Sequence, residues 1–273
     1  MAEGYIHSYG ADEQARLVDQ AAVLERYVHP GMRFPPGARV LEIGCGVGAQ
    51  MAVVLRRHPT AHVTGIDVAE AQLATACRML DAPLRAGAVS LVQGSGLALP
   101  FAAGSFDAVY LVWVLEHVGA DAVPLLREAA RVLRPGGRVW CTEVFNSGLY
   151  AYPEAPSLMA YWREFNALQR ALGGEPDVGA RLANLALAAG LEVEALDDVS
   201  AQLDARVAGE AARLAFVRSW QALLLSGAPA LEARGRVDGV LVNGMLEDFE
   251  RLARDPDGLF HYGLRQLRAA RPR

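Results

Sequence analysis

The chain of 273 residues carries a formal net charge of −5, and 52% of its residues are hydrophobic, enough for the core of one large or two small domains. All 26 Lys and Arg positions are arginine, which excludes mechanisms that need a lysine amine, such as Schiff-base chemistry, the phosphate-binding lysine of P-loop NTPases and the Tyr-x-x-x-Lys pair of short-chain dehydrogenases. The acidic balance argues against a nucleic-acid or anionic-membrane partner.

Three features of the sequence predict a cytoplasmic protein. Residues 1–3 do not lead from a basic segment into an apolar run, and no uncharged apolar stretch reaches membrane-spanning length. Cys45, Cys77 and Cys141 are odd in number and widely spaced, which indicates neither a disulfide framework nor a zinc site. We expect no metal cofactor, and a monomer or homodimer.

The first half of the chain predicts strands that alternate with helices. Apolar residues at spacings of three and four predict an N-terminal helix that ends at Pro30–Gly31. Strands are then expected at 39–43, 62–66, 89–92, 107–112 and 138–144, and helices at about 48–58, 70–80 and 120–133. The last of these helices should end at residues 134–137, since proline prevents continuation and glycine suits a C-cap. Alternation at this spacing indicates a parallel sheet covered on both faces.

The pattern changes after Val144. An aromatic loop is expected at 146–156, helices at 157–172 and 178–189, a sixth strand at 191–196, and a last strand at 259–267. Between the last two strands lie about sixty residues of helical pattern, broken at Gly227–Pro229.

The absence of repeats and flexible linkers predicts one domain over 1–273. Its expected parts are an N-terminal helical cap (1–35), a cofactor-binding core (36–146) and substrate-side helical additions at 147–189 and 200–256.

Three glycines, Gly44, Gly46 and Gly48, connect the first strand to the next helix. Glycine lets the backbone approach a ligand without interference from a Cβ, at the sheet edge where open α/β folds bind ligands. The spacing Gly44-x-Gly46-x-x-Ala49 also satisfies the dinucleotide fingerprint, with Asp67 about where a ribose-binding acid is expected. An NAD(P)-binding oxidoreductase is therefore one alternative.

Three observations favour another class of nucleotide-binding protein. Glu42 stands in the end of the strand where a dinucleotide fold usually has an apolar residue, and a helix of about twenty residues precedes that strand. Downstream motifs also have no role in hydride chemistry: Gln93-Gly94-Ser95, Leu99-Pro100-Phe101, Ser105-Phe106-Asp107-Ala108-Val109, Leu115-Glu116-His117-Val118 and Leu133-Arg134-Pro135-Gly136-Gly137.

With these motifs, residues 36–144 resemble the class I S-adenosylmethionine-dependent methyltransferases, and Val40–Gly48 resembles the glycine signature of that superfamily. The segment Tyr9–Ala21 is similar to the opening of some microbial small-molecule methyltransferases. The resemblance implies an α/β, Rossmann-like fold: a seven-stranded, mostly parallel sheet with a reversed last hairpin and helices on both faces. It also implies S-adenosylmethionine as cofactor, S-adenosylhomocysteine as product, and a place in bacterial secondary metabolism.

The resemblance further implies roles for individual residues. The backbone of Gly44 and Gly46 should line the methionine part of the cofactor, Glu42 should orient its amino-acid end, and Asp67 should bind the ribose hydroxyls. The remaining cofactor contacts that it implies are Val68, Gln72, Gly94, Ser95, Gly96, Leu97 and the carbonyl of Leu111. Ser95 departs from the family, which usually has Asp there, and a hydroxyl is a weaker acceptor than a carboxylate.

Methyl transfer is an in-line displacement, so the nucleophile must lie roughly 3 Å from the methyl carbon in a dry pocket. A base is needed only if the nucleophile starts protonated. His117 and Glu143 are the catalytic candidates, with Tyr5 and His7 as groups that could close from the N-terminal segment. A packing role for His117 and a backbone-bonded carboxylate at Glu143 are the competing interpretations.

Aromatic residues after the fifth strand predict the substrate site. The substrate candidates are Trp113, Phe145, Tyr150, Tyr152 and Trp162, with Tyr161 and Phe165 in the same cluster and Phe216 and Trp220 in the insertion before the last strand. That insertion is expected to act as a lid. An enclosed aromatic pocket predicts a small, apolar or planar substrate. A non-catalytic protein on the methyltransferase scaffold is the second alternative.

Overall fold

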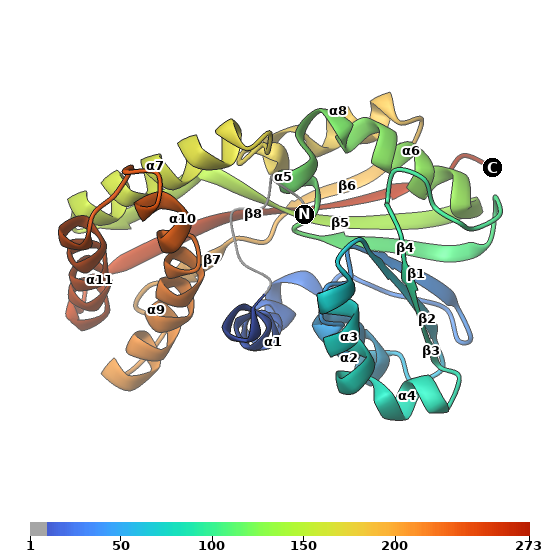
Figure 1. Ribbon diagram of the computed structural model, residues 1–273, viewed down its shortest axis with the longest axis horizontal. Coiled ribbons are helices and arrows are strands. Elements are labelled where there is room, and N and C mark those ends of the chain that lie inside the picture. The colour runs from blue at the N-terminus through green and yellow to red at the C-terminus, as the bar shows by residue number, and fades with distance from the viewer. Residues whose placement is uncertain (1–9) are drawn as a thin grey trace.

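The computed structural model describes residues 10–273, and one mixed sheet runs through the whole molecule (Figure 1). Its strands follow the order β3-β2-β1-β4-β5-β8-β6. They are β1 (Arg39–Ile43), β2 (His62–Asp67), β3 (Val89–Gln93), β4 (Phe106–Val112), β5 (Leu133–Tyr152), β6 (Glu192–Asp198) and β8 (Leu259–Ala270). The pairs among β1 to β5 are parallel, and β8 is antiparallel to both β5 and β6. The predicted mostly parallel sheet with a reversed last hairpin is confirmed.

One further strand was not predicted. β7 (Ala201–Leu203) pairs with β8 away from the main path of the sheet, so the described sheet has eight strands where the sequence predicts seven. Three residues are too few to produce a recognisable alternation, and their pairing depends on a partner some sixty positions later in the chain.

Helices cover both faces of the sheet because successive strand residues point in opposite directions. Val40 belongs to the hydrophobic cluster under α2 and α3, whereas Leu41 belongs to the cluster under α6 and α8. These elements are α2 (Ala49–Arg57), α3 (Glu70–Met79), the short α4 (Asp81–Arg85), α5 (Leu115–Val118), α6 (Ala122–Val132) and α8 (Leu182–Ala188), with 3-10 turns at Gly119–Asp121 and Val178–Arg181.

β5 differs most from its prediction. The loop expected at 146–156 is wrong, because β5 continues to Tyr152 and pairs with β8 as far as Leu259. A register shift between Phe145 and Tyr150 interrupts this ladder. The expected boundary between core and additions at 146/147 therefore falls inside a strand. At the other end, α6 stops at Val132 and residues 134–137 are an irregular part of β5 instead of a glycine cap.

The extended ends of β5 and β8 carry a group of helices that we call the helical lobe: α7 (Pro156–Ala171), α9 (Glu210–Leu225), α10 (Ala228–Glu232) and α11 (Gly239–Arg254). Figure 1 shows this lobe at one end of the molecule, with α1 (Ala11–Val28) lying between it and α2 and α3. Within residues 10–273, no helix combines the length and apolar character needed to cross a membrane.

A buried arginine holds the helical lobe together. Arg213 of α9 donates hydrogen bonds to five backbone carbonyls, those of Asp204 (3.0 Å), Leu252 (3.1 Å), Ala253 (2.9 Å), Asp255 (2.9 Å) and Gly258 (2.7 Å). Four of these carbonyls belong to the end of α11 and the turn after it, where the helix dipole is negative. The guanidinium therefore ties α9 to the turn that leads into β8.

Replacing Arg213 with methionine should lower the free energy of unfolding by about 3 kcal/mol, because buried carbonyls would lose their donors. Urea denaturation of the variant and the wild type measures this difference. Arg218→Met, an exposed position on the same helix, is the matched control and should change stability by no more than about 0.5 kcal/mol. Equal effects of the two substitutions would contradict the assignment.

Candidate functional site

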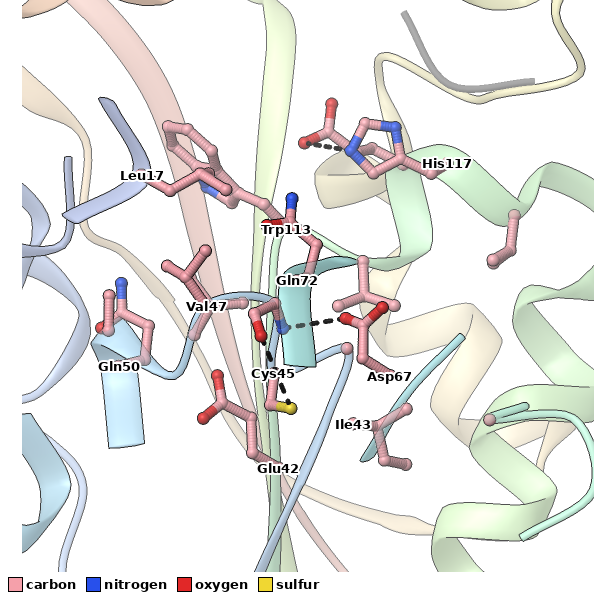
Figure 2. Close-up of a pocket in the computed structure, with 18 of the residues that line it drawn as sticks. Leu17, Glu42, Ile43, Cys45, Val47, Gln50, Asp67, Gln72, Trp113 and His117 are labelled. Carbon is pink, nitrogen blue, oxygen red and sulfur yellow. Dashed lines mark hydrogen bonds and ion pairs between the residues drawn. The ribbon is translucent and has the colours of Figure 1, made fainter. Parts of the chain in front are cut away.

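A cavity of about 420 Å³ opens at the carboxyl ends of the central strands. Its wall contains the glycine loop after β1, the ends of β2 and β4, the segment after β3, and residues of α1, α7 and α9. Figure 2 shows the part of this wall around the glycine loop. Open α/β sheets bind ligands at this edge, on either side of the point where the strand order reverses. Here that point lies between β1 and β4.

The glycine loop has the shape expected of a ligand cradle. Gly44 and Gly46 have φ angles of +72° and +49°, a conformation that favours glycine. A Cβ on Gly44 would lie 2.6 Å from a methyl carbon of Val114, whereas one on Gly46 would have no protein atom within 4 Å. Since Gly46 lines the cavity, its missing side chain leaves space for a bound molecule.

Two carboxyl groups flank this loop, that of the buried Glu42 and that of the part-buried Asp67. The Tyr110 hydroxyl donates to Glu42 Oε2 (2.6 Å), and burial raises the pKa of Glu42 to about 8 against the opposing effect of that bond. Asp67 accepts hydrogen bonds from the backbone N–H groups of Gly46 and Ala69, both at 2.8 Å, and burial raises its pKa too. A cationic ligand in the cavity would favour the charged form of both groups.

The segment after β4 is under backbone strain. Trp113 has a φ of +57°, and it is the one non-glycine residue within 10–273 with a positive φ. Its N–H donates to the carbonyl of Thr142 (2.9 Å). Glu143 accepts from three consecutive backbone N–H groups, those of Val114 (2.8 Å), Leu115 (2.7 Å) and Glu116 (3.4 Å). Strand β5 thus holds this segment in its strained conformation.

Glu143 itself lies behind the cavity wall. Its side chain is fully buried and does not line the cavity. Burial and the nearby carboxylate of Glu116 raise the pKa of Glu143 to about 8, while the three N–H donors act in the opposite direction. The carboxyl group therefore acts on the backbone of the segment that carries His117.

His117 lines the cavity beside the buried side chain of Glu116. Its Nε2 lies 3.6 Å from Oε1 of Glu116, a contact marked by a dashed line in Figure 2. The other oxygen of Glu116 accepts a hydrogen bond from Gln169 Nε2 of α7 (2.7 Å). The helical lobe thereby contributes to the position of the Glu116–His117 pair.

Aromatic side chains form the opposite part of the cavity, which we call the aromatic wall: Trp113, Trp162, Phe165 and Tyr262. The rings of Trp162 and Phe165 stack at 5.0 Å, and Tyr262 lies 5.7 Å from Trp162 and 6.1 Å from Trp113, between ring centroids. The Tyr262 hydroxyl donates to Asn146 Oδ1 (3.0 Å), so its polar end is satisfied inside the wall.

The cavity brings together most of the residues that the sequence singled out. Those in its wall are Glu42, Gly44, Gly46, Asp67, Val68, Gln72, Gly94, Ser95, Gly96, Leu97, Trp113, His117 and Trp162. Glu143, Leu111, Phe145, Tyr150 and Tyr152 are not among the lining residues.

The predicted residues that do not line the cavity lie elsewhere for different reasons. Leu111 is buried in the core beneath α6, whereas Tyr150 and Tyr152 are 50% and 63% exposed on the extended part of β5. Tyr150 stacks on His261 of β8, with the ring centroids 4.7 Å apart. Phe145 lies at the register shift. Tyr5 and His7 lie outside the described residues.

Other lining residues were not singled out as site residues by the sequence. They are Arg16, Leu17, Gln20 and Ala21 of α1, Gln50 of α2, Asn146, Leu223 and Tyr262. The apolar spacing predicted the helix that holds Leu17 and Ala21, but nothing local shows what a helix covers. No group of three or more His, Cys, Asp or Glu side chains within 10–273 is arranged to hold a metal ion.

The sheet topology distinguishes the two classes of protein that the glycine loop predicts, the NAD(P)-binding oxidoreductases and the methyltransferases. Dinucleotide-binding domains have the parallel strand order 3-2-1-4-5-6. Here the antiparallel β8 is inserted between β5 and β6. The sheet therefore differs from that of a dinucleotide-binding domain.

Comparison with known proteins agrees with this topology. Residues 41–141 match the family model of the methyltransferase domain. O-methyltransferase rstn1 of Aspergillus nomiae NRRL is 32% identical over 145 residues, which are 52% of this chain and 64% of that protein. O-methyltransferase resE of Aspergillus sclerotiorum is 31% identical over 155 residues, or 56% of this chain and 58% of that protein. The matched regions thus span about three fifths of these two relatives.

Solved structures share the fold at low identity. The cyclase SpnF superposes with a TM-score of 0.56 at 23% identity, over 94% of this chain and 81% of its own. Geranyl diphosphate methyltransferase, in complex with GPP and sinefungin, gives 0.54 at 19% identity, over 93% and 77%. Residues 41–141 therefore match the methyltransferase domain, and the solved structures share the fold that the resemblance implies.

The raised pKa of Glu143 predicts how stability depends on pH. With a pKa of about 8 in the folded state, against about 4.3 in the unfolded chain, the folded state retains the proton between these values. The contribution of this carboxyl to stability is therefore present below about pH 4 and lost as the pH rises through 8.

Glu143→Gln, which mimics the protonated group, should gain stability relative to the wild type by about 1 kcal/mol or more as the pH rises from about 5 to 8.5. Urea denaturation at several pH values gives the difference between variant and wild type. Glu192→Gln, at an exposed position, should show a constant difference. A constant difference for Glu143→Gln as well would refute the expectation.

Proposed function

We propose that this chain transfers a methyl group from S-adenosylmethionine to a hydroxyl oxygen of a small aromatic or apolar molecule in secondary metabolism. One observation carries the proposal: a single cavity joins the glycine loop and its two acids to the aromatic wall, with His117 in the same wall. The methyltransferase family of residues 41–141 supports it.

The described residues fit the cofactor. Gly46 leaves space for a ligand beside Glu42 and Asp67, whose carboxyl groups suit a cationic molecule. Two buried polar atoms in residues of the wall, Gln72 Oε1 and Trp113 Nε1, have no partner within the described chain. Buried polar atoms in proteins nearly always have partners, so a ligand with donors and acceptors is expected here.

Each residue would then have a defined task. Asp67 would accept the ribose hydroxyls, while Val68, Ser95, Gly96 and Leu97 would surround the adenine. Glu42 and the backbone of Gly44 and Gly46 would hold the methionine part. When bound, the cofactor supplies an electrophilic methyl group on a sulfonium.

The remaining residues would prepare the acceptor. The imidazole of His117 would take the hydroxyl proton, and the Glu116 carboxylate, 3.6 Å from its Nε2, would stabilise the imidazolium. Glu143 would act as a positioning residue that fixes the backbone of this segment. The aromatic wall would exclude water and align a planar substrate. The relatives named O-methyltransferases support oxygen as the acceptor atom.

Isothermal titration with S-adenosylhomocysteine tests the cofactor. The wild type should bind it, and Asp67→Asn should weaken binding by about 10- to 100-fold, because charge-assisted hydrogen bonds to the ribose are lost. Asp121→Asn, at an exposed position, is the control. Binding of NAD(H) without binding of S-adenosylhomocysteine would favour the oxidoreductase instead.

Turnover with a panel of hydroxylated aromatic compounds, followed by mass spectrometry for one added methyl group, tests the reaction. His117→Asn should lower kcat by about 10²- to 10⁴-fold while the affinity for S-adenosylhomocysteine stays unchanged. Cofactor binding without turnover on any compound would favour a non-catalytic protein, or another reaction on the scaffold that the cyclase SpnF shares.

A further inference from the structure

The acidic side chains of the cavity wall cannot bind the carboxylate of the proposed cofactor, S-adenosylmethionine. Besides the sulfonium, S-adenosylmethionine has an amino-acid end with an ammonium and a carboxylate. The acidic residues of the wall, Glu42, Asp67 and Glu116, suit cationic groups, and in their ionised form they offer that carboxylate no hydrogen-bond donor and repel it. A cation or several N–H donors must therefore face it.

The described wall contains one arginine, Arg16 of α1, and the chain has no lysine. The Arg16 side chain is only 12% exposed, which is unusual for a residue on a helix that packs across the outside of the core. Guanidinium groups are the side chains best matched to carboxylates because they donate two parallel hydrogen bonds.

Arg16 is held from behind by a buried acid. Its Nε donates to Glu13 Oε2 (2.8 Å) and its Nη2 to Glu13 Oε1 (2.5 Å), while Nη1 bonds to Gln20 Oε1. Glu13 is 3% exposed and is not part of the cavity wall. These bonds use three of the five N–H groups of the guanidinium, so Nη1 and Nη2 each retain one N–H beyond the contacts with described residues.

α1 lies on the side of the cavity where the amino-acid end belongs. Figure 2 shows Leu17, the next residue after Arg16, on the same side of the view as Val47 and Gln50, with Asp67 on the opposite side of the glycine loop. Asp67 marks the ribose end, so a ligand that extends from it across the loop reaches α1.

α1 is also fixed in place at both ends. Near its start, Gln14 donates to the carbonyl of Ala71 (3.2 Å) and accepts from the Thr75 hydroxyl (2.7 Å) on α3. At its end, Gln266 of β8 donates to the carbonyl of Val28 (2.7 Å). The position of Arg16 over the cavity is therefore set before any ligand binds.

We propose that Arg16 binds the carboxylate of the methionine part of the cofactor, and that Glu13 positions its guanidinium for this contact. The assignment rests on the proposed function, since it needs S-adenosylmethionine or its product as the ligand. In this arrangement α1 contributes directly to cofactor affinity in addition to covering the cavity.

The test compares two ligands that differ in the amino-acid end. S-adenosylhomocysteine has the carboxylate, whereas 5′-methylthioadenosine has the same adenosine and a sulfur but no amino-acid part. In isothermal titration, Arg16→Gln should weaken S-adenosylhomocysteine binding by about 10- to 100-fold and change 5′-methylthioadenosine binding by less than about 2-fold. Arg16→Lys should retain part of the affinity, since it keeps the charge and loses the paired donors.

Arg26→Gln is the matched control, because Arg26 is an exposed arginine on the same helix outside the cavity wall. Equal weakening of both ligands by Arg16→Gln would show that the Arg16–Glu13 pair only supports α1, and unchanged binding of both would remove Arg16 from the site. Either result overturns this proposal while leaving the methyltransferase proposal intact. A wild-type chain that binds neither ligand would overturn the proposed function itself.

Discussion

The antiparallel pairing of β5 with β8 is the interaction on which the two halves of the molecule depend. It begins inside the sheet at Arg138 and Ala270 and continues past the carboxyl edge to Tyr152 and Leu259. The helical lobe packs on this projecting ribbon, and β8 contributes Tyr262 to the aromatic wall. The ladder restricts the position of the lobe relative to the glycine loop much more than a chain connection alone could, because an unpaired connection keeps its conformational freedom.

Buried polar groups then join the lobe to the loop after β4. Glu143 of β5 binds three backbone N–H groups of that loop, and Gln169 of α7 binds the carboxylate beside His117. Such groups are stable inside a protein only when their hydrogen bonds are satisfied, so they restrict the relative positions of the segments more than apolar contacts do. The same restriction accounts for the strained backbone of Trp113, which the surrounding bonds hold in place.

The charged and the aromatic side chains of the cavity wall lie in different parts of it. Acidic residues lie around the glycine loop and beside His117, Arg16 lies on the covering helix, and aromatic rings fill the remaining wall. This distribution suits a ligand with several charges at one end of the cavity and an uncharged planar molecule at the other.

Local patterns were sufficient for the parallel core and for its ligand loop. Gly44, Gly46, Glu42 and Asp67 lie within or directly after short apolar strands, and such strands meet at one sheet edge whatever the rest of the fold does. The aromatic wall was only partly predictable. Trp162 was predicted correctly, but Tyr150 and Tyr152 were expected in a loop of the substrate site. In the structure they belong to strand β5, and their side chains are exposed. Tyr262 and Arg16 were not singled out as site residues, because their places depend on the register of β8 against β5 and on how α1 packs across the core. Those are contacts between residues far apart in the chain, which only the tertiary structure decides.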